Sequence, residues 1–143
     1  MDYRKFDDKL YVRLDKGDEI ITALTAVCEK EKLSVAQIQG IGGCESVTVG
    51  VFDADKKCYN ETTVEGLLEM TSLDGSLTSY EGKPYLHLHA AFAYCEDGEI
   101  RPLSGHLLKA VIGLTGEIVV TPAKGQIGRK YIEELGIRIW DFE

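Results

Sequence analysis

The chain has 143 residues, 44% of them hydrophobic and 28% charged, a balance that is ordinary for a globular domain and excludes a disordered or fibrous protein. This length suits one domain with its own core, so we expect a single domain over residues 1–143. The 16 basic and 24 acidic residues leave a net charge of −8, which disfavours unaided binding to DNA or to an anionic membrane, although a local basic patch can still bind phosphate.

The start of the chain, MDYRKFDDKLYVRL, lacks the apolar segment and the small-residue cleavage site of a secretory signal peptide. No stretch approaches the roughly 20 apolar residues of a transmembrane helix. We therefore expect a cytoplasmic protein without a membrane partner. The four cysteines are scattered without a Cys-x-x-Cys pair, and this pattern favours small buried residues over a zinc site: Cys28, Cys44, Cys58 and Cys95.

The first elements expected along the chain are a strand over 9–14 and a helix over 18–32. Between them, Asp15-Lys16-Gly17-Asp18 is typical of a turn whose aspartates can cap the helix. The apolar residues of the helix recur at helical spacing, which predicts one buried face: Ile20, Leu24, Val27 and Cys28.

The rest of the chain predicts short strands joined by turns. Tight turns are expected at Gly40–Gly43 and at Asp74-Gly75, with 77–80 pairing back across the second turn. The run 107–113 fits a strand or a short helix, and 127–135 fits a short helical turn. The remaining segments are expected to be strands: 35–40, 46–52, 62–73, 85–94, 117–122 and 137–142. One helix and many strands indicate an α+β (mixed α/β) fold with a largely antiparallel sheet.

The strand over 85–94 alternates between two faces and carries two histidines on one of them. Side chains two residues apart share a face, so His87 and His89 stand side by side. His106 follows beyond a turn, and it lies near this pair if the chain doubles back there. Three neutral imidazoles suit zinc first, with iron or nickel as alternatives, and they leave an open coordination position for water or a small-molecule ligand. The alternative is three polar side chains that are hydrogen-bonded on a half-exposed face.

Two further groups of residues are candidates for a site. Glu69 sits in the apolar segment Leu67–Met70, where a carboxylate can be a general base, a fourth ligand or a partner that orients a histidine; a strand residue facing water is the alternative. Lys124, Arg129 and Lys130 form a small basic cluster, which we expect to be solvated surface, with an anion contact as the alternative. No dinucleotide fingerprint, phosphate-binding loop or nucleophile elbow is present.

Several segments, in this order, resemble the plants-and-prokaryotes conserved (PPC) domain. They are Gly66–Met70, Leu73–Ser76, Tyr85–Ala90, Gly105–Leu107 and Thr115–Val119. All three histidines match the prokaryotic pattern, and the resemblance covers nearly the whole chain. It implies a curved, largely antiparallel sheet with one main helix near the start of the chain, and assembly as a homotrimer.

The resemblance implies functions between which the residues alone do not decide. Stand-alone prokaryotic members are commonly labelled as predicted DNA-binding proteins, and plant members carry an AT-hook. This chain has no AT-hook, because Arg101-Pro102 lacks the preceding Arg-Gly, and Leu67 replaces the arginine of the plant segment. We expect a homotrimer that binds a divalent transition metal through His87, His89 and His106, with DNA binding as the alternative and a protein-binding scaffold as a third. No feature names a substrate or decides whether the chain is an enzyme.

Overall fold

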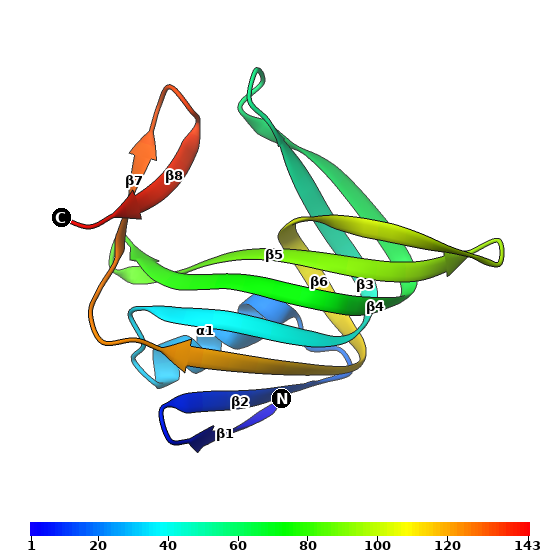
Figure 1. The fold of residues 1–143 in the computed structure, drawn as a ribbon, viewed down its shortest axis with the longest axis horizontal. Helices are drawn as coiled ribbons and strands as arrows, with labels where there is room; N and C mark the ends of the chain where they lie inside the picture. The colour runs from blue at the N-terminus through cyan, green and yellow to red at the C-terminus, as the bar shows by residue number, and fades with distance from the viewer.

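Eight antiparallel strands and one α-helix form the protein, and a computed structural model describes all residues 1–143 (Figure 1). This confirms the mostly antiparallel sheet with one short helix near the start of the chain. The helix, at 11 residues, lacks the length and apolarity needed to cross a membrane. In chain order the elements are β1 (Asp2–Phe6), β2 (Lys9–Asp15), α1 (Ile20–Lys30), β3 (Ala36–Asp53), β4 (Cys58–Tyr80), β5 (Lys83–Glu96), β6 (Glu99–Pro122), β7 (Gly128–Ile132) and β8 (Ile137–Asp141).

Six strands form one sheet in the order β1-β2-β6-β3-β4-β5, and β6 also pairs with β5. Because β6 pairs with both β3 and β5, each of the strands from β3 to β6 pairs with two others of this group, and the sheet curls (Figure 1). The first part of β6, Glu99–His106, pairs with β5, and the rest runs beside β3, so the strand changes partner at His106. Strands β7 and β8 form a separate hairpin that rises from one end of the sheet.

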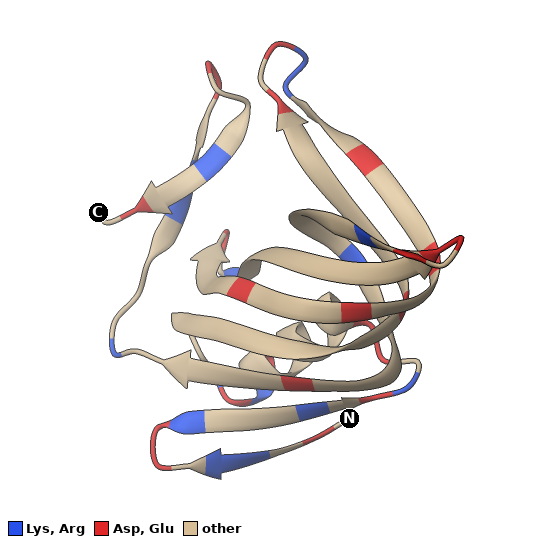
Figure 2. Cartoon of the chain, turned by 45° about the vertical axis from the view of Figure 1, so that its right-hand side comes forward, with Lys and Arg blue, Asp and Glu red and all other residues tan.

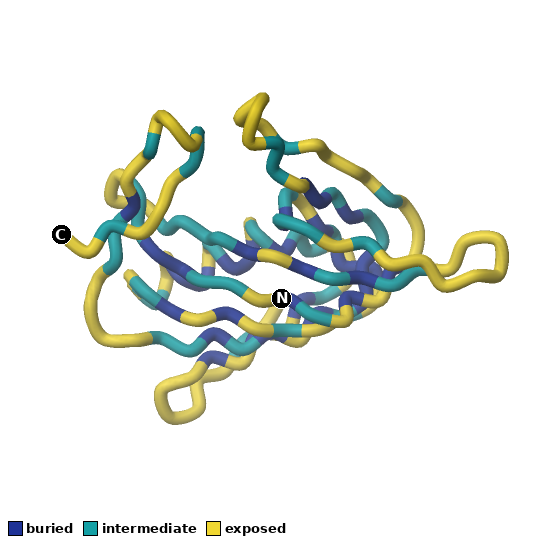
Figure 3. Tube along the Cα trace, turned by 45° about the horizontal axis from the view of Figure 1, so that its top comes forward, coloured by how far each residue is buried: buried dark blue, intermediate teal, exposed yellow.

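The hydrophobic core lies between helix α1 and the sheet. Strand β2 shows the alternation that builds it, because Leu10, Val12 and Leu14 are at most 2% exposed while the residues between them face solvent. Burying such a side chain contributes about 1.5–3 kcal/mol. The tips of the hairpins are exposed, and the buried residues gather in the middle of the molecule (Figure 3). Every apolar helix position expected to be buried is buried: Ile20, Leu24, Val27 and Cys28.

The N-cap of helix α1 lies one residue after Asp18, the later of the two aspartates expected to cap it. Glu19, rather than an aspartate, is the N-cap, and its carboxylate accepts hydrogen bonds from the backbone N–H groups of Ile21 (3.1 Å) and Thr22 (2.8 Å). The same carboxylate lies 3.4 Å from the backbone nitrogen of Ala110 in β6. One side chain therefore both caps the helix and ties it to the sheet.

Glu19→Ala is expected to lower the free energy of unfolding by about 1–2 kcal/mol, the usual cost of removing an N-cap acceptor. Urea denaturation of the two proteins measures this difference. Glu29→Ala is the matched control, since Glu29 is exposed on the same helix and should change stability by less than about 0.5 kcal/mol. Equal stabilities for the two variants would contradict the capping role.

Two predicted turns are wrong, because both segments lie inside long strands. Gly40–Gly43 is part of β3, where a register shift bends the strand without reversing it. Asp74-Gly75 is part of β4, where the aspartate pairs with Gln39 of β3 on one side and His89 of β5 on the other. Residues 77–80 therefore continue the strand. Backbone N–H and C=O groups gain partners on two flanking strands here, and this outweighs the local preference for a turn.

The end of the chain also differs from its predicted structure. The helical turn expected over 127–135 is wrong, because Gly128–Ile132 forms strand β7. Ile127, Tyr131 and Leu135 lie four residues apart, a spacing that imitates a helix. The run 107–113 is part of strand β6. Strand β1 gave no sequence signal because nearly all its residues are exposed and show no alternation.

Candidate metal centre

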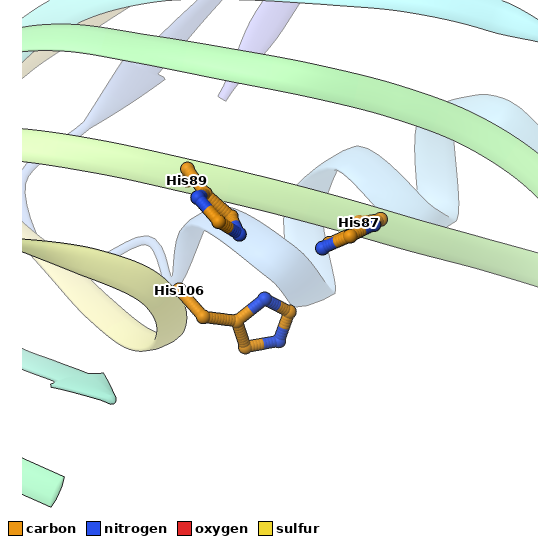
Figure 4. Close-up of side chains that lie close together, drawn as sticks. All are labelled: His87, His89 and His106. Carbon is orange, nitrogen blue, oxygen red and sulfur yellow. The ribbon is translucent and has the colours of Figure 1, made fainter. Parts of the chain in front are cut away.

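The three histidines meet on one side of the curled sheet (Figure 4). His87 and His89 extend from β5, and His106 extends from β6, where it pairs directly with His89. The ring centroid of His87 lies 5.2 Å from that of His89 and 5.1 Å from that of His106. The centroids of His89 and His106 are 5.4 Å apart. One nitrogen from each ring lies within 4.8 Å of the other two. The chain thus doubles back and brings the predicted ligands together.

His106 is positioned where β6 leaves β5 and joins β3. It pairs with Gly50 of β3 as well as with His89. A Cβ atom at Gly50 would lie 2.9 Å from side-chain atoms of Tyr59, so glycine leaves room for this tyrosine on β4. The Tyr59 ring stacks on the His106 ring with centroids 4.8 Å apart and 14° between the planes. Stacking and strand pairing together orient the third imidazole.

The surroundings of His87 and His106 favour neutral rings. Burial, followed by the charges of His87, His89 and Arg129, lowers the pKa of His106 to about 4. Burial also lowers the pKa of His87, with smaller contributions from Arg129 and His89. At neutral pH both rings are therefore uncharged, and a neutral imidazole has a nitrogen lone pair to offer a metal ion.

The donor set fits a transition metal. Three imidazoles, with no carboxylate in the cluster, are ligands of zinc, iron, nickel or copper rather than of magnesium or calcium. The Nδ1 atom of His106 is buried without a hydrogen-bond partner, and an unpartnered buried nitrogen is destabilising unless something binds it. A metal ion bound by the three rings holds nitrogens about 2.0–2.1 Å from itself. His87, His89 and His106 are thus suited to hold one such ion.

A cavity of about 730 Å³ adjoins two of the histidines. His87 and His89 form part of its wall, together with Thr78 of β4 and Trp140 of β8. Pockets for small molecules usually have volumes of about 300–1,000 Å³. The site therefore has space for a ligand beside the imidazoles of His87 and His89.

Arg129 is a residue near the site whose burial the sequence did not predict. Expected as solvated surface, it is instead only 8% exposed, and its guanidinium lies over the ring of Tyr85, 4.4 Å from the centroid. Tyr85 is two residues before His87 on β5 and shares its face. The missed signal is the alternation of Ile127, Arg129 and Tyr131, which is typical of a strand rather than of a helical turn.

Glu69 lies apart from the histidines in this chain. It pairs with Ala93, four residues along β5 from His89, which corresponds to roughly 13 Å at the rise of a strand. It is exposed and lines a separate smaller pocket with Thr115 and Glu117. The geometry of one chain therefore does not bring its carboxylate to the three imidazoles, and its catalytic role stays a prediction.

The curled antiparallel sheet and its clustered imidazoles define a class, a small β-rich protein with a three-histidine candidate metal centre. Residues 1–124 match the Plants and Prokaryotes Conserved (PCC) domain. The chain belongs to this family, which confirms the resemblance seen in the sequence. The matched residues include all three histidines, while the β7–β8 hairpin follows them in the chain.

Solved structures of similar proteins agree with this assignment. A candidate DNA-binding protein from Bacteroides thetaiotaomicron is 33% identical, with a TM-score of 0.92 and coverage of 99% of this chain and 96% of that chain. A metal-containing protein from Archaeoglobus fulgidus is 27% identical, with a TM-score of 0.84 and coverage of 98% of both chains. A plant- and prokaryote-conserved protein from Pyrococcus horikoshii is 26% identical, with a TM-score of 0.83 and coverage of 98% and 93%. No curated protein matches the sequence.

Proposed function

We propose that this protein binds one divalent transition-metal ion per chain through His87, His89 and His106. The observation that carries the proposal is the convergence of three imidazoles whose nitrogens lie within 4.8 Å of one another. Zinc is the first choice, with iron or nickel as alternatives, because all three accept imidazole ligands. The metal-containing relative from Archaeoglobus fulgidus supports the same function.

The cavity beside His87 and His89 gives the site room for a small-molecule ligand. Three protein ligands leave one position of a tetrahedral ion open. An ion bound there would act as a Lewis acid on a ligand in that position. The chain's own part is to hold the rings of His87 and His106 neutral and to shape the cavity around the ligand.

Assembly as a homotrimer belongs to the same proposal. Ile41, Leu67 and Leu114 are each more than half exposed, and large apolar side chains of this kind suit a contact between subunits. Sedimentation of the purified protein measures its mass in solution.

Zinc binding is expected to reach about one equivalent per chain in protein purified without an affinity tag and stripped with a chelator. Because zinc would bind only the folded state, free zinc at 100 times its Kd should raise the free energy of unfolding by about 2.7 kcal/mol. Calorimetric titration and thermal melting measure the two effects. Less than about 0.1 equivalent bound, with an unchanged Tm, would reject the metal site.

DNA binding, which the name of the Bacteroides relative suggests, is the alternative. It is disfavoured because acidic residues lie among the basic ones along the chain (Figure 2) and the net charge is −8. Two of the three residues of the predicted basic cluster are also less available to contact phosphate. Arg129 is 8% exposed, and Lys130 forms an ion pair with Asp141 at 3.1 Å. A gel shift that weakens steeply with salt would support this alternative.

A further inference from the structure

The guanidinium of Arg129 is buried and only partly satisfied. Its Nε donates to the hydroxyl of Thr78 (2.8 Å) and its Nη1 donates to the carbonyl of Arg138 (3.1 Å). Its Nη2 is buried and has no hydrogen-bond partner. A buried donor without an acceptor costs the free energy of its lost hydration, and the cost is larger for a charged group. This arginine therefore has one nitrogen free for an acceptor that the chain does not supply.

The arginine lies on the face of the β7–β8 hairpin that borders the cavity. Arg129 pairs directly with Trp140, and directly paired residues of antiparallel strands point to the same face. Trp140 lines the cavity, and so does Ile127, which is two residues before the arginine. Thr78, which accepts the Nε hydrogen bond, belongs to the cavity wall as well. Arg129 itself does not line the cavity, but it hydrogen-bonds to one residue of the wall, Thr78, and pairs with another, Trp140.

No carboxylate neutralises this charge. Arg129 takes part in none of the ion pairs of the chain, and the nearby aspartate of the hairpin, Asp141, pairs with Lys130 instead. Removing one charge from water without a counter-ion is strongly unfavourable. A divalent ion at the three histidines would add positive charge to the same region. Both charges are best balanced by an anion that binds between them.

We propose that the cavity binds a small organic monocarboxylate, with one carboxylate oxygen accepting a hydrogen bond from Nη2 of Arg129. The proposal rests on the metal site proposed above and names the class of its ligand. The apolar body of the ligand packs against the cavity residues Val35, Pro122, Ile127 and Trp140.

A monocarboxylate suits the cavity better than phosphate does. Asp74 lines the cavity beside His89, and hydrogen bonds from Ser72 and Gln39 lower the pKa of its carboxyl. This negative charge repels a phosphate dianion more strongly than a carboxylate monoanion. The apolar part of the wall, which includes Val35, Pro122 and Trp140, also offers contact to a hydrocarbon group, which phosphate lacks.

The test uses butyrate, butyramide and inorganic phosphate as probes of the zinc-loaded protein. Zinc affinity is measured first for the wild type and for Arg129→Gln, Arg129→Lys and Lys130→Gln. Calorimetry then gives the Kd of each probe. We expect butyrate to bind the wild type at least about 10-fold more tightly than butyramide, and Arg129→Gln to weaken butyrate binding by about 10-fold or more, the range of a hydrogen bond to a charged group. Lys130→Gln, which removes the neighbouring exposed cation, should bind butyrate as the wild type does.

The outcomes separate the two proposals. A wild type that takes no zinc refutes the proposed function. If zinc binds, each of three results overturns the carboxylate site alone. These are no preference for butyrate over butyramide, undiminished butyrate binding by Arg129→Gln, and tighter binding of phosphate than of butyrate. If Arg129→Gln does not fold, Arg129→Lys takes its place, because it keeps the charge and loses the planar fork. A wild type without a preference for butyrate over butyramide overturns the carboxylate site without any variant.

Discussion

Alanine at both His87 and His89 is expected to abolish stoichiometric metal binding. Only His106 would remain of the three imidazoles, and one imidazole holds a divalent ion weakly. Loss of a partner that merely orients a ligand already lowers affinity by about 10–100-fold, so loss of two ligands should lower zinc affinity by more than about 100-fold. Elemental analysis of the double variant beside the wild type, and zinc titration of both, measure this effect.

The double variant should keep its fold, which makes the result interpretable. His89 is exposed and His87 half-buried, whereas their neighbours Leu88 and Ala90 are 1% and 5% exposed and face the core. The metal-free double variant should therefore match the metal-free wild type in stability to within about 1 kcal/mol. Lys109→Ala, exposed on β6 beyond His106, is the control and should retain one equivalent of zinc. A double variant that also retains one equivalent would show that the ion binds elsewhere.

Gly75→Ala is expected to lower the free energy of unfolding by at least about 2–3 kcal/mol. A Cβ atom at Gly75 would lie directly against the backbone carbonyl oxygen of His87 and 2.9 Å from Cα of Leu88. Overpacking against side chains already costs about 1–3 kcal/mol, and a backbone carbonyl within a paired strand moves less easily than a side chain. Urea denaturation of the metal-free proteins measures the loss.

The same substitution should weaken the metal site, because the displaced backbone belongs to His87. We expect Gly75→Ala to lower zinc affinity together with stability, although it removes no ligand. Ser76→Ala is the matched control, since Ser76 is the next residue of β4, is only partly buried and loses a single hydroxyl group, which should change stability by less than about 0.5 kcal/mol. A Gly75→Ala protein as stable as the wild type would show that strands β4 and β5 separate without cost.

Local patterns predicted those parts of the fold that depend on one element at a time. The alternation of β5 placed His87 and His89 on one face, and the spacing of Ile20, Leu24 and Val27 identified the buried face of α1. Partner exchange within the sheet was not predictable in this way. Asp74-Gly75 has the composition of a turn, yet it lies in mid-strand because β3 and β5 both pair with it.

For the candidate site, too, some features follow from local sequence and others from tertiary pairing. The sequence by itself determined the residue types and the shared face of His87 and His89, because the period of a strand is a local property. Only the tertiary structure brought His106 beside them, through the change of partner by β6, and buried Arg129 against Tyr85. Both results depend on pairing between segments distant in the chain, and such pairing is decided by which arrangement satisfies the backbone of every strand and buries the apolar faces together.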